Sequence, residues 1–198
     1  MNEITNDSSI KVGVSYQTKG WEGNAVAHRE QQEFCQTVKH RFPDCFQNKR
    51  VLEVGSRDVN GSVRDQFADC DYMGIDAETG NGVDQVCLGH EFEANPESFD
   101  VVCSLETFEH DPYADKTVAH MLSLLRPGGL FFMTCAGEGR KEHGTSRTGE
   151  LFGPNPDYYQ NVSLRMFLDW IRETSFEELY LNHNTAANDL YCFAIKAR

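Results

Sequence analysis

The feature that most restricts the fold is a regular alternation, from residue 50 onward, of short apolar runs with turn-forming or helical segments. The run RVLEV at 50–54 is nearly continuous in its apolar character, which is typical of a strand buried on both faces of a sheet. Comparable runs follow at 72–76, 82–88, 98–105 and 130–137. Strands that alternate with helices predict an α/β protein with a doubly wound, Rossmann-like, mostly parallel sheet and right-handed crossovers.

The flanking segments supply the helices and the last strands. Apolar residues at helical spacing predict helices at about 24–41, at 113–125 and after Ser163, and we interpret GSVRDQFAD at 61–69 as a further helix. The runs FEELYLN and DLYCFAIKA near the end predict an antiparallel hairpin. The expected architecture is therefore a seven-stranded sheet that ends in a C-terminal antiparallel hairpin, with helices on both faces.

Composition excludes some partners and compartments. The formal net charge of the 198 residues is −13, so the chain lacks the positive field with which proteins bind nucleic acid non-specifically. The seven cysteines are scattered without a CxxC pair, which indicates buried, reduced thiols rather than a zinc site or a disulfide framework. The N-terminal segment does not resemble a secretory signal, and no apolar run reaches membrane-spanning length. We therefore expect a cytoplasmic protein without membrane association.

The turn after the first apolar run has the composition of a nucleotide cradle. In EVGSRDVNGS at 53–62, Gly55 permits a sharp turn close to a ligand and Gly61 can begin the next element. Asp76 ends the following run 21 residues after Gly55, where an acid can accept hydrogen bonds from both ribose hydroxyls of a nucleoside. The dinucleotide fingerprint GxGxxG is not met because Arg57 stands at its second glycine, and the P-loop pattern is missing. A packing turn followed by a solvated acid is the alternative, and we favour the nucleoside site.

Two longer blocks carry a resemblance to a known family. ESFDVVCSLETFEH at 97–110 and LLRPGGLFFMT at 124–134, with EVG at 53–55 and Asp76, resemble class I S-adenosylmethionine-dependent methyltransferases, especially the small methyltransferase-domain enzymes. The likeness is strong over about residues 50–137. It implies S-adenosylmethionine as the cofactor and one methyltransferase domain over 1–198. Its parts would be an N-terminal lid and helix (1–45), a cofactor-binding core (50–137), a substrate-side loop (138–162) and a C-terminal helix and hairpin (163–198).

The resemblance also implies cofactor contacts at the ends of the predicted strands. Residues at the end of the first strand and in its turn would hold the methionine part of the cofactor and its amino group. The acid that ends the second strand would hold the ribose, and the residue after this acid would lie beside the adenine. Residues at the end of the fourth strand would lie near the sulfonium. In chain order these residues are Glu53, Gly55, Ser56, Gly61, Asp76, Ala77, Gly89, His90, Ser104 and Leu105. The sequence departs from the family at Arg57 and Val59, where glycines are common. Leu88 stands where an acid often contacts the adenine, so Gly89 and His90 are left to make that contact.

Candidate catalytic and acceptor-binding residues follow the fourth and fifth strands. Methyl transfer depends on positioning, and a hydroxyl acceptor also needs a base, for which His110 and His143 are the candidates. A solvated loop histidine is an equal reading of His143. Arg147, Tyr158 and Tyr159 are candidate acceptor contacts, and the basic segment GRKEHGTSR at 139–147 could serve an anionic acceptor.

The pattern ExxEH at 106–110 raises the question of a metal. It places Glu106, Glu109 and His110 close together, and in a few relatives, such as ubiquinone-pathway and small-RNA 2′-O-methyltransferases, it holds a divalent metal with a further histidine, here His143. In many relatives the same EH pair is only a structural turn. Because the ligand set is incomplete without long-range information, we predict no metal and retain these four residues as the candidate set.

The expected function is methyl transfer from S-adenosylmethionine to a small or medium-sized acceptor, with O-methylation as one form of the reaction. One rival is a catalytically silent S-adenosylmethionine-binding module. Another is an NAD-type oxidoreductase, which Arg57 and the terminal hairpin disfavour. Trp21, in the N-terminal segment, is interpreted either as part of a lid over the cofactor or as a packing residue.

Overall fold

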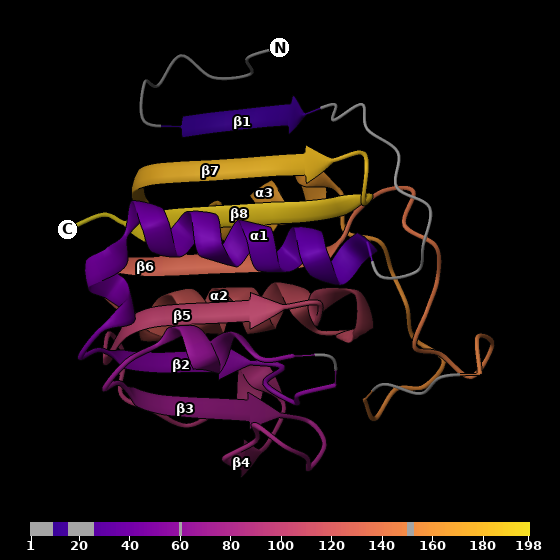
Figure 1. Cartoon of the computed structure of the whole chain (residues 1–198), viewed down its shortest axis with the longest axis horizontal. Helices are drawn as coiled ribbons and strands as arrows, with labels where there is room; N and C mark the ends of the chain where they lie inside the picture. The colour runs from indigo at the N-terminus through magenta and orange to yellow at the C-terminus, as the bar shows by residue number, and fades with distance from the viewer. Residues whose placement is uncertain (1–9, 16–25, 60, 150–152) are drawn as a thin grey trace.

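The computed structural model describes residues 10–15, 26–59, 61–149 and 153–198. Within these ranges the strands form one sheet of eight, in the order β1-β7-β8-β6-β5-β2-β3-β4 (Figure 1). The strands are β1 (Ile10–Ser15), β2 (Arg50–Val54), β3 (Asp71–Asp76), β4 (Gln85–Val86), β5 (Phe99–Leu105), β6 (Leu125–Ala136), β7 (Phe176–Asn184) and β8 (Asp189–Lys196). Among the described strands, only β8 runs antiparallel to both of its neighbours. The predicted mostly parallel sheet with a C-terminal antiparallel hairpin is confirmed, and β1 adds an eighth strand beside β7.

Helices cover both faces of the sheet, as predicted. The helix α1 (Val26–Arg41) lies on one face, and α2 (Ala114–Leu124) and α3 (Leu164–Ile171) lie on the other (Figure 1). Each face has its own cluster of buried side chains, with Phe34 and Val38 of α1 in one and Val118 of α2 in the other. Two covered faces explain why the central strands read as continuous apolar runs. Over the described residues, none of the helices combines the length and the apolar character that crossing a membrane requires.

The prediction of a helix at 61–69 is wrong. The chain forms only one 3-10 turn, η2 (Val63–Gln66), which the Ser62 hydroxyl caps by accepting from the Arg64 amide. The Phe67 ring then stacks on Phe46 with ring centroids 4.4 Å apart, and the Ala68 amide donates to the Phe46 carbonyl at 2.9 Å. These contacts draw the chain into an extended path after a single turn, so tertiary packing overrides the local helical pattern.

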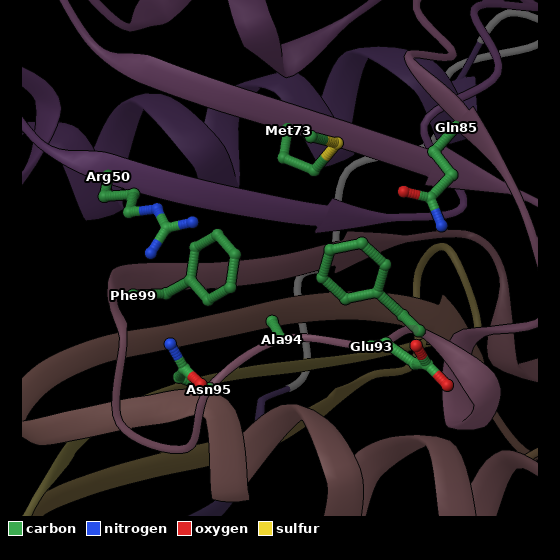
Figure 2. Close-up of a pocket in the computed structure, with 8 residues that line it drawn as sticks. Arg50, Met73, Gln85, Glu93, Ala94, Asn95 and Phe99 are labelled. Carbon is green, nitrogen blue, oxygen red and sulfur yellow. The ribbon is translucent and has the colours of Figure 1, made fainter.

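The connection from β4 to β5 is irregular. It contains the 3-10 turn η3 (Gly89–Glu91), whereas crossovers between parallel strands usually carry an α-helix that covers the sheet. A cavity of about 520 Å³ lies between this connection and the strands beneath it. Figure 2 shows it between Arg50 and Phe99 at one end and Gln85 at the other, with Met73 between them. This cavity starts at the amino ends of β2 and β5 and is separate from the predicted cofactor residues.

The sheet also fixes where a ligand can bind. The strand β2 lies between β3 and β5, so the chain leaves β2 on one side for β3 and returns on its other side as β5. The carboxyl ends of β2, β3, β5 and β6 share one edge, which we call the ligand edge. The first residue of β8 lies there too, because Asp189 pairs with Ala136. In doubly wound sheets ligands bind at such an edge, at the point where the strand order reverses.

Candidate active site

The turn that follows β2 and begins at Gly55, which we call the cofactor turn, needs a glycine for two reasons. Gly55 has φ +80°, a left-handed conformation that side chains other than glycine rarely adopt. A Cβ atom at this position would also lie 1.9 Å from the Thr107 Oγ1 atom, which packs directly on the turn. The turn is tied to the neighbouring strand because the Gly55 and Ser56 amides both donate to the Ile75 carbonyl, at 2.8 and 3.0 Å. The first predicted cofactor residues are therefore held rigidly at the ligand edge.

Asp76 stands at the carboxyl end of β3, where the sequence predicts a ribose-binding acid. Its Oδ2 atom accepts from the Arg57 amide at 3.2 Å and its Oδ1 atom accepts from the Glu78 amide at 2.9 Å. Arg57, the residue that departs from the glycine pattern, pairs with Glu78 through its guanidinium. One hydrogen bond to each oxygen orients the carboxylate and leaves lone pairs for further donors such as ribose hydroxyls.

Glu53 lies beneath the turn with only 4% of its surface exposed. Burial raises the pKa of its carboxyl to about 7, and the hydrogen bond that it accepts from the Tyr72 hydroxyl at 2.8 Å opposes that shift. A carboxyl with this pKa changes its charge readily near neutral pH. It is therefore suited to respond to a cationic group, such as the amino group of an amino acid.

Several buried polar atoms at the ligand edge have no partner among the described residues. They are the Ser56 Oγ, His90 Nδ1 and Ser104 Oγ atoms, and all three belong to predicted cofactor residues. Buried polar groups normally have hydrogen-bond partners, so this set indicates a polar ligand. The residues present fit S-adenosylmethionine, because a glycine turn and an oriented acid stand at the ends of the adjacent strands β2 and β3, and unpaired polar atoms lie in the segments around them.

The other predicted cofactor residues lie around this turn. Gly61 and Leu105 line a small cavity together with residues of α1 and of η2, and Ala77 follows Asp76 at the end of β3. Gly89 packs so closely that a Cβ atom there would lie 2.5 Å from the Thr117 side chain. The neighbouring His90 ring lies 4.7 Å from that of Tyr113, measured between centroids. Sequence reasoning did not identify Tyr113, whose contact with His90 depends on a helix 23 residues further along the chain.

Beyond β5, three of the four candidate metal ligands converge. Ligand atoms of Glu109, His110 and His143 all lie within 4.8 Å of one another, and we call these residues the Glu–His–His trio. The Tyr159 ring packs against both imidazoles, with centroid distances of 5.4 Å to His110 and 5.1 Å to His143. The fourth candidate, Glu106, is directed elsewhere, because its Oε1 atom accepts from the Thr134 hydroxyl at 2.8 Å.

The trio is rich in hydrogen-bond acceptors. Glu109 is fully buried; its own amide and that of Ala136 approach the carboxylate, but neither carboxylate oxygen makes a hydrogen bond of good geometry with the described residues. Burial raises the pKa of this carboxyl well above its usual range. Burial, and then the nearby His143, lower the pKa of His110 to about 4, so this imidazole is neutral at physiological pH.

His143 adds a further lone pair to the trio. Its Nδ1 atom lies 3.1 Å from the Lys141 carbonyl oxygen, which can only accept, so the proton of this hydrogen bond sits on Nδ1. In the neutral imidazole the lone pair is then on Nε2, which lies 3.9 Å from the Glu109 Oε1 atom. The trio therefore places one nitrogen or oxygen atom of each side chain within 4.8 Å of the others.

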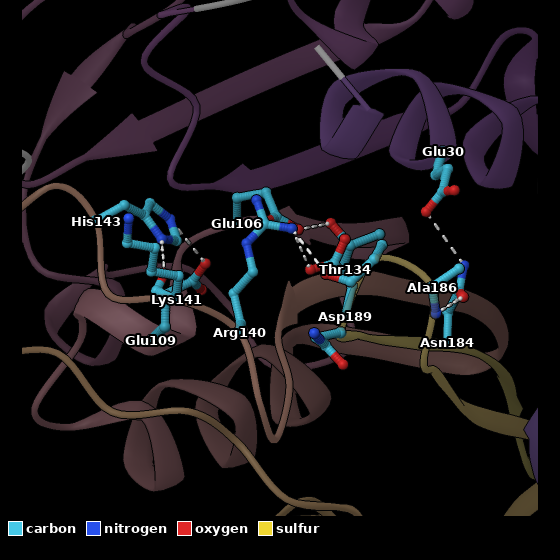
Figure 3. A network of polar contacts seen from close by, with 12 residues as sticks. Glu30, Glu106, Glu109, Thr134, Arg140, Lys141, His143, Asn184, Ala186 and Asp189 are labelled. Carbon is cyan, nitrogen blue, oxygen red and sulfur yellow. Dashed lines mark hydrogen bonds and ion pairs between the residues drawn. The ribbon is translucent and has the colours of Figure 1, made fainter. Parts of the chain in front are cut away.

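A second polar group lies beside the trio along the ligand edge (Figure 3). Arg140 donates to the buried Asp189 at 2.9 Å and to the Ala187 carbonyl at 3.0 Å, and the Tyr191 hydroxyl donates to Asp189 at 3.3 Å. Burial, followed by the nearby Glu106, raises the pKa of Asp189 to about 8. Sequence reasoning did not identify Asp189 and Tyr191, since nothing in the hairpin pattern reveals which end of β8 joins the ligand edge.

The remaining predicted acceptor residues organise the loop after β6. Arg147 donates to the Glu142 carboxylate at 2.7 Å and to the Asp157 carbonyl at 2.9 Å. The Tyr158 hydroxyl donates to Gln160 at 2.9 Å. Of the three predicted acceptor contacts, only Tyr159 packs on the trio. Trp21 lies outside the described residues.

Comparisons with known proteins agree with this geometry. No curated protein matches the chain. Among solved structures, the chain is similar to 1,6-didemethyltoxoflavin-N1-methyltransferase of Burkholderia thailandensis, with 14% identity, a TM-score of 0.61, and coverage of 88% of this chain and 80% of that one. It is also similar to phosphoethanolamine N-methyltransferase 2 of Haemonchus contortus, with 18% identity, a TM-score of 0.63, and coverage of 84% and 53%. A third is the CurJ carbon methyltransferase, with 12% identity, a TM-score of 0.63, and coverage of 88% and 56%.

These similarities establish a shared fold. The named enzymes differ in the atom that they methylate, which is nitrogen in the first two and carbon in the third. The chain spans only about half the length of the second and third of these proteins. The family assignment comes from the sequence itself, because a family model described as a methyltransferase domain matches residues 26–170, which is most of the chain. The chain therefore belongs to the methyltransferase-domain family of class I S-adenosylmethionine-dependent methyltransferases.

Proposed function

We propose that the protein transfers a methyl group from S-adenosylmethionine to a small or medium-sized acceptor bound at the ligand edge above β5 and β6. The observation that carries this proposal is that the Gly55 turn with Asp76 lies close to the Glu–His–His trio. The short segment 106–110 connects them, because it contacts Gly55 through Thr107 and carries two members of the trio. The oriented Asp76 and the Gly55 turn lie on one side of the point where the strand order reverses, and the Glu–His–His trio lies on the other. Cytoplasmic location and the lack of non-specific nucleic acid binding stay predictions from composition.

The residues divide the work of the reaction between them. When bound, the cofactor supplies an electrophilic methyl group, and the protein fixes its approach to the acceptor. Gly55, Ser56 and Asp76 hold the cofactor, with Ser104 and Leu105 near its sulfonium. Tyr159 forms a wall of the acceptor site, and Arg147 and Tyr158 shape the loop behind it.

His143 is the proposed base for an oxygen acceptor. The Lys141 carbonyl fixes the proton of its imidazole on Nδ1, which leaves the Nε2 lone pair free to take a proton. His110, whose pKa of about 4 keeps it neutral, lies beside it and adds no competing charge. O-methylation is therefore the form of the reaction that we propose first.

Calorimetry followed by turnover tests this function. We expect S-adenosylmethionine and S-adenosylhomocysteine to bind and NAD not to bind, and binding of NAD alone would reject the proposal. A panel of hydroxyl and amine acceptors is then screened for S-adenosylhomocysteine release, with amines included because two similar enzymes are named as N-methyltransferases. We expect His143→Ala to lower turnover of a hydroxyl acceptor by about 100-fold or more. His40→Ala, a change to an exposed histidine on α1, serves as the control. Equal, slow turnover in all three proteins would favour a silent binding module.

The trio favours a second candidate, metal-assisted transfer. Two imidazoles and one carboxylate whose ligand atoms lie within 4.8 Å form a donor set that divalent metals bind, with positions left for an acceptor oxygen. A metal there would lower the pKa of an acceptor hydroxyl. Glu109 fits this role because its buried oxygens make no hydrogen bond of good geometry with the described residues. This candidate departs from our sequence-based preference for no metal.

Metal content tests the second candidate independently of activity. After incubation with Mn²⁺ or Zn²⁺ and dialysis, we expect about one metal ion per chain by mass spectrometry, and about a tenth of that in Glu109→Gln. Glu106→Gln is the matched control, since the Glu106 side chain is directed to Thr134 and an amide oxygen can still accept that hydrogen bond. Equal metal content in the wild type and in Glu109→Gln would exclude the trio as the site.

A further inference from the structure

Thr107 lies between the cofactor turn and the segment that carries Glu109 and His110, which we call the acceptor side. Its Oγ1 atom lies 1.9 Å, and its Cγ2 atom 2.7 Å, from the position that a Cβ atom of residue 55 would take, so this side chain packs on the bare backbone of Gly55. The Thr107 hydroxyl donates to the Leu105 carbonyl at 3.1 Å and lies 3.5 Å from the Val54 carbonyl. One side chain thus contacts the ends of β2 and β5, the two strands between which the strand order reverses.

The same residue begins the turn that carries half of the acceptor side. The 3-10 turn η4 (Phe108–His110) follows directly, and the His110 amide donates to the Thr107 carbonyl at 3.0 Å. Phe108 is buried and anchors this turn in the core below. Because only one residue separates Thr107 from Glu109, a displacement of Thr107 displaces two members of the trio.

The residue before Thr107 is fixed as well. Glu106 has φ +52°, a conformation that costs a residue with a side chain some energy and that persists only where the surroundings hold it. Its amide donates to the Thr134 carbonyl at 2.9 Å, and its carboxylate accepts from the Thr134 hydroxyl at 2.8 Å. The segment 106–110 is therefore held by β6 at Glu106 and by the core at Phe108, while Thr107 alone in that segment rests on the cofactor turn in the contacts described here.

We propose that Thr107 is a positioning residue that fixes the distance between the cofactor turn and Glu109–His110, and hence between the methyl donor and the acceptor. This inference rests on the proposed function, because it assigns Thr107 a part in the transfer itself. In-line displacement is sensitive to such distances, and a misplacement of about 1 Å can lower the rate about 100-fold. Thr107 touches neither ligand in this proposal and acts only through the two segments that it separates.

Three variants separate the features of this side chain. Thr107→Val keeps the shape and removes the hydroxyl, Thr107→Ser keeps the hydroxyl and removes the methyl group, and Thr107→Ala removes both. With the acceptor identified by the turnover screen, we expect Thr107→Ala to lower kcat about 30-fold while the KM for S-adenosylmethionine changes less than about threefold. Thr107→Ser and Thr107→Val should each recover part of the loss. Thr37→Ala is the matched control, because the Thr37 hydroxyl also donates to a backbone carbonyl, that of Glu33, at an exposed place on α1.

A spectroscopic readout makes the test independent of the acceptor. In the wild type, saturating S-adenosylhomocysteine should shift the imidazole proton resonances of His110, assigned with a His110→Gln variant. In Thr107→Ala, with cofactor binding confirmed by calorimetry, we expect at least half of that shift to be lost. An undiminished shift, or a kcat that falls only in proportion to the loss of folded protein, would overturn the role of Thr107. Failure of the wild type to bind S-adenosylhomocysteine would instead reject the proposed function.

Discussion

Replacing Asp76 by alanine is expected to weaken the binding of S-adenosylmethionine and S-adenosylhomocysteine by about 100-fold or more, which corresponds to about 2.7 kcal/mol. Hydrogen bonds between an ionised carboxylate and two ribose hydroxyls are charge-assisted, and each is worth about 1.5–3 kcal/mol. The variant also removes the acceptor that orients the Arg57 and Glu78 amides, so the cradle itself loosens. Titration calorimetry of the cofactor-free protein measures the change directly.

The opposite end of the same strand provides the control for this prediction. Asp71 begins β3 and pairs with Arg50 at the opposite edge of the sheet. Asp71→Ala therefore removes the same charge and the same number of atoms. It should leave both affinities within about twofold, because Asp71 lies at the edge opposite Asp76 and exposed ion pairs contribute little to stability. An Asp76→Ala protein that binds as tightly as Asp71→Ala would show that the ribose is held elsewhere.

Replacing Glu53 by glutamine is expected to stabilise the cofactor-free protein at alkaline pH. The pKa of the buried Glu53 carboxyl is about 7, raised from 4.5 by burial, so the folded state binds this proton more tightly than the unfolded state does. The stability from this group is fully present below pH 4.5, declines as the pH rises, and is lost once the pH has passed about 7. The difference corresponds to about 3 kcal/mol, and glutamine avoids the loss because it stays neutral and its amide oxygen can still accept from Tyr72.

Urea unfolding at intervals between pH 4 and pH 8.5 measures the effect. The wild type should lose stability relative to Glu53→Gln across this range, and the two curves should differ most above pH 7. Glu173→Gln is the control, since Glu173 is exposed and pairs only with the adjacent Arg172 among the contacts described here. If the free energies of unfolding of the wild type and of Glu53→Gln changed in parallel with pH, the pKa of Glu53 would not be raised by folding. If Glu53 also holds the cofactor's amino group, the stabilised variant should bind S-adenosylmethionine more weakly.

Much of the fold can be predicted from the sequence because the central strands are buried on both faces. The run at 50–54, the strand that ends at Asp76, the helix that ends at Leu124 and the terminal hairpin all carry strong local signals, and each lies where expected. The helix predicted at 61–69 is wrong, because Phe67 stacks on Phe46 instead of continuing a helix. The strand β1 was not predicted either, because an edge strand beside β7 has no continuous apolar run.

The two halves of the candidate site differ in how far the sequence reveals them. Gly55 and Asp76 are readable because they stand at the ends of strands whose positions are themselves readable. The trio is only partly readable, because His143 lies 33 residues beyond His110 in a loop of no regular pattern. Thr107 carries no signal of its own, since its importance depends on a contact with the backbone of a residue 52 positions earlier.

The direction of β8 has a practical consequence for handling this protein. Because β8 runs antiparallel to β6 and β7, it begins at the ligand edge with Asp189 and ends at the opposite edge, where Arg198 pairs with the side chain of Glu177. Eight residues of strand separate these two edges by about 25 Å. An affinity tag or a fluorophore attached at Arg198 is therefore held away from the ligand edge, whereas a label inserted in the 185–188 turn would sit directly beside Arg140 and its partners.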